Sequence, residues 1–213
     1  MILIYGGTFD PIHLGHTRLV EHVFSHLEFD EFRFMPCFKP VHKVDAGISA
    51  DHRIEMLNLA IKALPEKYRK KIVTDDREVR SGKPKFSVDS LAEIRHEIGE
   101  ETPIAFVMGA DSLLGLETWH QWCELARYCH LVVVSRPGFD VSLVPAPILE
   151  AFQWIDQASA KQLLTKPGGS CYFLPGLEQN ISSTMIRADI QENKNSVPQV
   201  VFDYILRNHL YNA

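Results

Sequence analysis

The sequence predicts an α/β protein built on a Rossmann-like, doubly wound parallel sheet. Short apolar runs typical of buried strands alternate with segments whose apolar residues recur at helical spacing. Glycine-rich or polar turns follow several of these runs. This alternation implies right-handed crossovers between parallel strands. At 213 residues, with 46% hydrophobic and 23% charged residues, we expect one domain over 1–213 with a substantial core.

The first strand is predicted at 1–5 and the first helix at 17–27, with a glycine-rich turn between them. In open α/β sheets ligands bind beyond the carboxyl ends of strands, which is where this turn lies. Gly6 and Gly7 would let the backbone turn sharply and approach a ligand closely. Thr8 adds a hydroxyl group to the N–H groups at the helix start, which suit a phosphate.

Two histidines close this turn. His13 and His16 are three residues apart, a spacing that places them on one face if both are helical. Two imidazoles at a helix start can donate to phosphate oxygens as charge builds up in a transition state. One alternative is a zinc pair, although no cysteine or acidic residue stands nearby at ligand spacing. The other is an ordinary glycine-rich turn with two incidental histidines.

The eleven residues from Gly6 to His16 read G-G-T-F-D-P-I-H-L-G-H. They resemble the H-x-G-H signature of the nucleotidyltransferase superfamily, in the form typical of bacterial nicotinate-mononucleotide adenylyltransferases. The resemblance implies the nucleotidyltransferase version of the α/β fold. It also implies catalysis by His13 and His16. ATP binding is implied for the first four residues of the string, Gly6, Gly7, Thr8 and Phe9.

A second strand is predicted at 31–35, followed by a proline-bounded loop that delivers His42 and Lys43 to the same rim. The resemblance extends here, because relatives carry P-x-x-x-P-P-H-K, although Val41 replaces the second proline. It implies that His42 contacts the mononucleotide and that Lys43 contacts the phosphates of ATP.

The next elements are a helix at 51–64 with Asp51 as its N-cap, a strand at 72–74 and a helix at 88–98. Phe86 and Ser87 precede this last helix, where many relatives have Tyr-Thr. The retained hydroxyl of Ser87 either binds the mononucleotide or simply caps the helix.

A strongly apolar strand at 103–108 runs into Gly109 and Asp111. These residues match the family motif G-x-D-S-L, which implies contacts of Asp111 with nucleotide ribose in ATP and in the mononucleotide. A magnesium-bound water is another partner for this carboxylate, and capping of the following helix is the alternative. Trp119 is expected on a helix, either stacking on a pyridine ring or buried in the core.

A strand at 130–134 ends before Arg136, whose permanently charged guanidinium suits a phosphate clamp. Residues 139–169, with a helical stretch to Leu164, are predicted as a peripheral insertion. A strand at 171–174 then leads to C-terminal helices from about 183, the last at 199–210.

The start of these helices resembles the second family signature, I-S-S-T-x-I-R. It implies phosphate contacts from Ile181, Ser182, Ser183 and Thr184, and a catalytic role for Arg187. A serine that merely caps the helix is the alternative. Many relatives have a basic residue where this chain has Asp189, so one phosphate contact is absent here.

Composition excludes several classes. A net charge of −5 argues against broad binding to nucleic acid or acidic membranes. The apolar runs are shorter than a membrane span, and the four scattered cysteines predict reduced thiols in the cytoplasm. A Walker-type phosphate loop and an H-E-x-x-H motif are both missing.

The resemblance therefore implies transfer of AMP from ATP to nicotinate mononucleotide, giving deamido-NAD and pyrophosphate. Magnesium is expected to arrive with ATP, without a dedicated protein site. Nicotinamide mononucleotide and phosphopantetheine are the alternative acceptors. A non-catalytic nucleotide sensor would bind ATP without releasing pyrophosphate. A tRNA-charging domain would need a longer chain. The sequence leaves the oligomeric state open.

Overall fold

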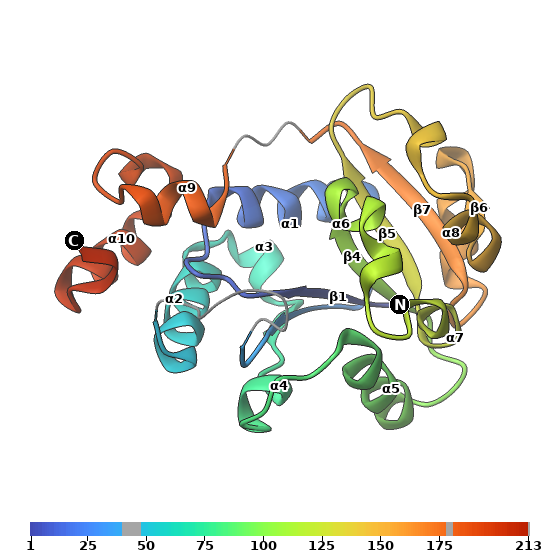
Figure 1. Ribbon diagram of the computed structural model, residues 1–213, viewed down its shortest axis with the longest axis horizontal. Helices are drawn as coiled ribbons and strands as arrows, with labels where there is room; N and C mark the ends of the chain where they lie inside the picture. Colours follow the sequence, from blue (N-terminus) through green and yellow to red (C-terminus); the bar gives the residue numbers. More distant parts are fainter. Residues whose placement is uncertain (40–47, 178–180, 213) are drawn as a thin grey trace. The chain divides into compact units, whose positions relative to one another are not determined.

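The computed structural model describes residues 1–39, 48–177 and 181–212. Its strands form one seven-stranded sheet in the order β3-β2-β1-β4-β5-β7-β6 (Figure 1). The β1–β4, β4–β5, β5–β7 and β6–β7 pairs are parallel, which confirms the predicted fold class. The strands are β1 (Ile2–Gly7), β2 (Glu31–Pro36), β3 (Ile72–Thr74), β4 (Ile104–Gly109), β5 (His130–Ser135), β6 (Gln153–Ile155) and β7 (Ser170–Pro175).

The helices are short, apart from α1, α2 and α5. They are α1 (Leu14–His26), α2 (Ala50–Ala63), α3 (Glu66–Arg69), α4 (Arg77–Arg80), α5 (Ser87–Ile98), α6 (Ala110–Leu114), α7 (Leu125–Tyr128), α8 (Ala146–Ala151), α9 (Ser183–Ala188) and α10 (Gln199–Arg207). Within the described ranges, no helix is both long and apolar enough to cross a bilayer.

The chain divides into two compact units. The first comprises Met1–Gly6, Ser25–Arg33 and Lys85–Glu178. The second comprises Gly7–Phe24, Phe34–Pro84 and Gln179–Ala213. The first unit thus holds β4 to β7 with α5 to α8, and the second holds β3 with α2, α3, α4, α9 and α10.

In the first unit, the central strands are almost wholly apolar. All six residues of β5 are buried, as are the first five of β4. Parallel strands covered on both faces have this continuous apolar pattern, which is why the sequence revealed them. Helix α6 continues directly from β4 and packs on β4 and β5 (Figure 1).

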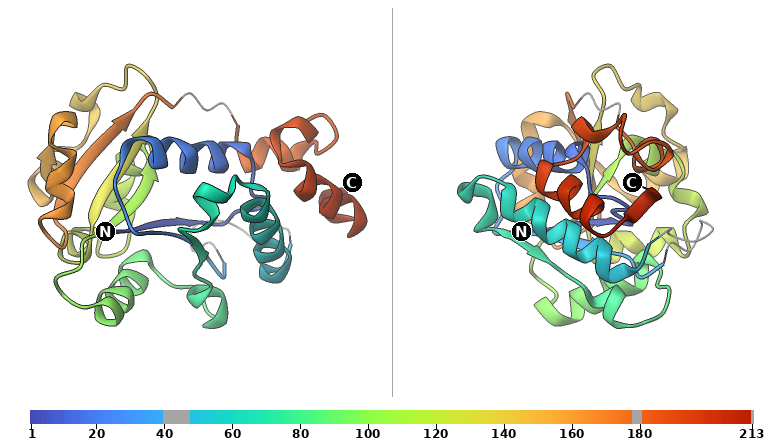
Figure 2. Two further views of the ribbon diagram at one scale, coloured as in Figure 1. Left: turned by 180° about the vertical axis from the view of Figure 1, so that it is seen from behind. Right: turned by 90° about the vertical axis from the view of Figure 1, so that its left-hand side faces the viewer.

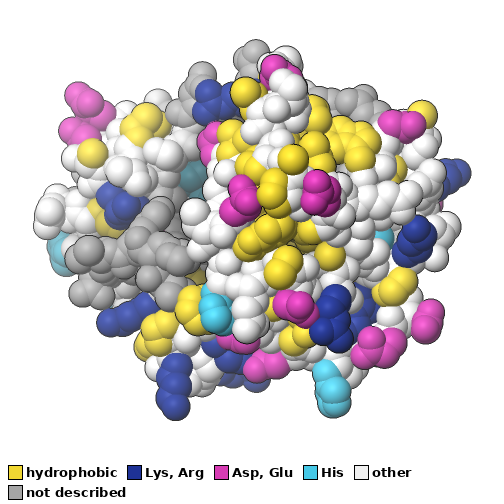
Figure 3. All heavy atoms as spheres, turned by 45° about the vertical axis from the view of Figure 1, so that its right-hand side comes forward, with side chains coloured by type: hydrophobic (Ala, Val, Ile, Leu, Met, Phe, Trp, Pro, Cys, Tyr) yellow, Lys and Arg dark blue, Asp and Glu magenta, His cyan; other side chains and the backbone are white. Residues whose placement is uncertain are grey.

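The segment 139–169 contains a strand that the sequence did not predict. Instead of one helical stretch to Leu164, it forms α8, the three-residue strand β6 and irregular helical turns. β6 pairs with β7 and is the last strand in the sheet order. The segment also carries exposed apolar side chains, Leu143 being 61% exposed. The molecular face drawn in Figure 3 has a gathering of hydrophobic side chains.

In the second unit, α10 packs beside α2 (Figure 2). The Tyr204 hydroxyl lies 2.8 Å from His52 Nδ1 across this contact. The N-cap of α2 is Ser49, whose side chain accepts from His52 N, so the prediction of Asp51 as the cap is wrong. Serine and aspartate cap equally well, and Asp51 lies inside the first turn.

Arg95 organises the loops of the first unit. Its side chain is 3% exposed, and its guanidinium donates to five backbone carbonyl oxygens, those of Gly99, Glu100, Thr102, Tyr128 and Pro167. The planar fork of donors can reach carbonyls that converge from several directions. One side chain therefore joins the end of α5 to loops more than 30 residues away in sequence.

We expect Arg95→Lys to lower the free energy of unfolding by about 3 kcal/mol, because a lysine has three donors and would leave buried carbonyls without partners. Denaturant titration would measure the loss. Arg127→Lys is the matched control, since Arg127 is exposed and forms a surface ion pair with Glu124. Equal stability of Arg95→Lys and wild type would contradict this role.

Candidate functional site

The glycine-rich turn differs from its predicted shape. Gly6 and Gly7 are the last residues of strand β1, so the sharp turn does not fall on them. The left-handed backbone conformation falls on Phe9, with a φ of 49°. Few residues other than glycine adopt this conformation, so the surrounding contacts must hold it.

The side chain of Phe9 is buried against His16. It is 2% exposed and packs edge-on against the rings of His16, at 5.1 Å, and Phe34, at 5.4 Å. A Cβ atom on Gly7 would come within 2.9 Å of the Phe9 ring. The absence of a side chain at Gly7 therefore makes room for Phe9. The phenyl group of Phe9 is buried support, which leaves only its backbone for the predicted contact with ATP.

The two histidines form a stacked pair. Their ring centroids are 3.7 Å apart with an interplanar angle of 25°. His13 lies just before α1, and its carbonyl accepts from His16 N and Thr17 N. The spacing argument assumed that both residues are helical, and His13 does not meet this condition. The two rings nevertheless lie next to each other, as expected.

A backbone hydrogen bond fixes the tautomer of His16. The N–H of His13 donates to His16 Nδ1 at 3.1 Å, so the ring proton of the neutral form lies on Nε2. Burial and the neighbouring His13 hold the pKa of His16 well below its usual value. Burial also lowers the pKa of His13, to about 4. Both rings are therefore neutral hydrogen-bonding groups at pH 7.

His13 also has an unused polar atom. Its side chain is 3% exposed, and Nδ1 has no hydrogen-bond partner among the described residues. A buried nitrogen without a partner is costly, and such exceptions are typical of functional sites. A ligand oxygen that accepts a hydrogen bond would satisfy a proton on this atom.

The second signature lies directly against the first. Ser183 Oγ donates to the carbonyl of Pro11 at 3.1 Å, which joins segments 172 residues apart. Ser182 is the N-cap of α9 and accepts from Met185 N, so the capping alternative is confirmed for this residue. Thr184 is exposed at the start of the helix, and Ile181, which precedes the cap, is partly buried.

Arg187 is anchored on the first signature. Its Nη1 donates to the carbonyl of Asp10 at 2.7 Å, and its Nη2 donates to Thr184 Oγ1 at 3.3 Å. The Asp10 carboxylate is buried and accepts a hydrogen bond from the hydroxyl of Tyr211. The predicted catalytic arginine thus reaches the histidine turn within the second unit.

Arg53 supports the backbone of the candidate site, and the sequence analysis missed it. It is 1% exposed, on α2, and donates to the carbonyls of Thr8, at 2.7 Å, and Phe38, at 2.6 Å. It therefore fixes both the histidine turn and the loop after β2. Its position four residues before Leu57, on the apolar side of α2, was the available signal. Cys37 lies in the same loop, with its Sγ 3.7 Å from Thr8 Oγ1.

The first unit holds the other predicted residues. Gly109 is the N-cap of α6, and Asp111 is exposed in the first turn without capping it. A Cβ atom on Gly109 would meet nothing within 4 Å. Arg136 is exposed immediately after β5. The capping alternative for Asp111 is therefore wrong, which leaves its carboxylate available for a ligand.

Ser87 and Trp119, which were predicted to bind the mononucleotide, also belong to this unit. Ser87 is the first residue of α5, so its N-cap alternative is wrong. Trp119 is not helical as predicted, because it adopts an extended conformation between two short helical turns. Its partly buried ring packs edge-on against Phe106 at 6.1 Å. The Phe86 ring stacks on His120 at 4.2 Å.

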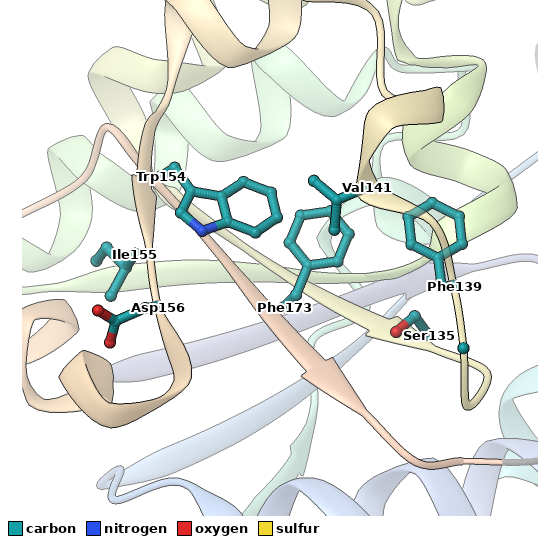
Figure 4. A pocket seen from close by; sticks show the side chains of 8 residues that line it. Ser135, Phe139, Val141, Trp154, Ile155, Asp156 and Phe173 are labelled. Carbon is teal, nitrogen blue, oxygen red and sulfur yellow. The ribbon is translucent and has the colours of Figure 1, made fainter.

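A small cavity of about 130 Å³ lies in the first unit (Figure 4). Its aromatic walls are Phe139, Phe173 and Trp154, with Phe173 stacked on both other rings. Ser135 and Asp156 add polar groups. None of the predicted site residues lines this cavity. His42 and Lys43, which were predicted to contact substrates, lie outside the described residues.

We expect the buried His13 to destabilise the fold in acid. Below pH 6.5 His13 binds a proton in the unfolded chain. In the folded protein, where its pKa is about 4, it stays unprotonated until a lower pH. The free energy of unfolding should fall by up to about 3 kcal/mol between pH 6.5 and pH 4 through this residue. Denaturant titrations across this range would show a shallower fall for His13→Gln. Identical pH dependence in variant and wild type would contradict the burial of this imidazole.

Comparisons with known proteins agree with this geometry. The family model described as cytidylyltransferase-like matches residues 4–189. A probable nicotinate-nucleotide adenylyltransferase from Cellvibrio japonicus is 42% identical, with 98% of this chain and 97% of that protein covered. One from a Marinomonas species is 36% identical, with 99% and 94% covered.

The fold also resembles that of Plasmodium falciparum nicotinic acid mononucleotide adenylyltransferase complexed with NaAD. The TM-score is 0.76 at 22% identity, covering 99% of this chain and 97% of that one. This likeness supports the architecture, whereas the family model and the bacterial relatives carry the assignment. The chain belongs to the cytidylyltransferase-like family, among the nicotinate-nucleotide adenylyltransferases.

Proposed function

We propose that this protein transfers AMP from ATP to nicotinate mononucleotide, forming deamido-NAD and pyrophosphate. The observation that carries the proposal is the stacked, neutral pair of His13 and His16, in which the buried Nδ1 of His13 has no partner among the described residues. The relatives' names supply the adenylyl group that is transferred and the nicotinate nucleotide that accepts it. The contact between the two signatures places Arg187 beside the same turn.

The reaction needs no nucleophile from the protein. A phosphate oxygen of the mononucleotide attacks the α-phosphorus of ATP, and the bond from this phosphorus to the bridging oxygen breaks. Pyrophosphate leaves with that electron pair. Catalysis of such a transfer depends on alignment and on stabilisation of the charge that moves to the leaving group.

In this mechanism the histidines act as hydrogen-bond donors. His16 would donate from Nε2, and His13 from its buried Nδ1, to oxygens of the α- and β-phosphates. Because neither ring is charged beforehand, each contact strengthens as negative charge develops on those oxygens. Arg187, together with Arg136 and Lys43, would provide the permanent positive charge that the triphosphate requires.

Residues of the first unit would recognise the nucleosides. The exposed carboxylate of Asp111 suits ribose hydroxyls, and Ser87 offers a hydroxyl group to the nicotinate carboxylate at the start of α5. The Trp119 ring is partly accessible and could stack on the pyridine ring. A carboxylate is preferred to an amide at helix-end N–H groups, which favours nicotinate over nicotinamide.

Magnesium would be supplied with ATP. The described residues contain no group of three or more histidine, cysteine, aspartate or glutamate side chains able to hold a metal. We propose a magnesium ion that is bound through substrate phosphates and keeps most of its waters. The ion would neutralise charge on the phosphates, while the protein groups orient them.

All four cysteines are free thiols, which supports the cytoplasm as the proposed location. Adenylyl transfer to nicotinamide mononucleotide or phosphopantetheine remains the competing function. Incubation with ATP, magnesium and each acceptor in turn would separate these activities, with pyrophosphate and the adenylylated product measured together. We expect the highest kcat/KM with nicotinate mononucleotide. Faster turnover of another acceptor, or ATP binding without pyrophosphate release, would overturn the proposal.

We expect His16→Ala to reduce kcat at least ~100-fold, because removal of one donor to a developing charge costs about 3 kcal/mol. Circular dichroism should show an intact fold. His26→Ala is the control, since His26 is exposed at the last residue of the same helix and should leave kcat unchanged. Undiminished turnover by His16→Ala would remove this residue from the mechanism.

A further inference from the structure

Tyr211 reaches back to the first signature from the opposite end of the sequence. Its hydroxyl donates to Asp10 Oδ1 at 2.6 Å, across 201 residues. Burial, together with the charge of Asp10, raises the pKa of Tyr211, so the hydroxyl remains a donor throughout the ordinary pH range. This is a charge-assisted hydrogen bond, a class that is shorter and stronger than one between neutral groups.

The backbone around Tyr211 is held in an unfavourable conformation. His209, Tyr211 and Asn212 have φ values of 51°, 59° and 61°. A bulky residue such as tyrosine rarely adopts positive φ, and it persists there only when the surroundings impose it. The left-handed turn aims the Tyr211 ring at Asp10. Strain of this kind, which clusters at functional sites, points to a role beyond packing.

Asp10 is shared between Tyr211 and Arg187. The carboxylate is 3% exposed, with Oδ1 bound to the tyrosine and Oδ2 3.9 Å from Arg187 Nη1. That same nitrogen donates instead to the carbonyl of Asp10. The Arg187 guanidinium has five N–H donors. Among the described residues, Nη1 and Nη2 each donate one hydrogen bond. The arginine therefore keeps donors that can reach a phosphate.

We propose that Tyr211 is a positioning residue for ATP. By satisfying the buried carboxylate of Asp10, it keeps Arg187 from turning fully onto that carboxylate and away from the triphosphate. Without the hydroxyl, the carboxylate oxygen would lack its partner, and the guanidinium of Arg187, 3.9 Å from the other carboxylate oxygen, is a charged group that can replace it. This inference rests on the proposed function, since it assigns Arg187 to the phosphates of ATP.

The test is Tyr211→Phe, which removes only the hydroxyl group. We expect its kcat/KM for ATP to fall about tenfold, while kcat/KM for nicotinate mononucleotide, at saturating ATP, falls less than threefold. A general loss of structure would lower both values equally. The control is Tyr204→Phe, which removes a hydroxyl bound to His52 in the same unit and should leave both values unchanged.

A double-mutant cycle with Asp10→Asn tests the route of the effect. If Tyr211 acts through the carboxylate, adding Tyr211→Phe to Asp10→Asn should change kcat/KM for ATP less than twofold. A full tenfold loss in that background would overturn the inference, as would equal losses for the two substrates. Failure of the wild type to release pyrophosphate would instead refute the proposed function itself.

Discussion

Three guanidinium groups that donate to backbone carbonyls hold loops of this protein in place, and two of them, those of Arg53 and Arg95, are buried. Arg53 donates to Thr8 and Phe38, and Arg187 donates to Asp10, so both sides of the left-handed Phe9 are tied to distant elements. Arg95 plays the same part in the other unit. A buried charge is costly unless it is well bonded, and carbonyls from several loops provide those bonds. Loops that would otherwise move freely are thereby fixed.

In the proposed mechanism, this fixed frame would let two uncharged imidazoles bind a highly charged substrate. They would offer oriented N–H groups at little cost, because a neutral histidine is easier to bury than a charged one. Permanent charge would come instead from arginine, whose guanidinium does not lose its proton. The histidines would thus orient the phosphates through rigid, short-range hydrogen bonds. The arginines would attract the phosphates over a longer range. Preorganised donors of this kind need no rearrangement when charge moves during the reaction.

The sequence predicted what depends on local pattern and missed what depends on distant packing. The buried strands were predictable because parallel strands are continuously apolar, and both signatures are compact motifs. The short edge strand β6 was missed because two of its three residues, Gln153 and Trp154, are exposed, so it lacks the continuous apolar run of the buried strands. The extended backbone at Trp119 and the carbonyl contacts of Arg53 also arise from tertiary contacts. The link from Tyr211 to Asp10 spans almost the whole chain, beyond any local signal.

The contact between Gly7 and Phe9 has a consequence for how sequence variation at this turn should be interpreted. Since a methyl group at Gly7 would strike the Phe9 ring, and that ring lies against His16, the two positions form one steric unit. An alanine at position 7 should become acceptable only alongside a smaller, flexible side chain at position 9. Paired replacement at positions 7 and 9 would then reflect the space available next to the His16 ring. It would carry no information about which nucleotide is bound.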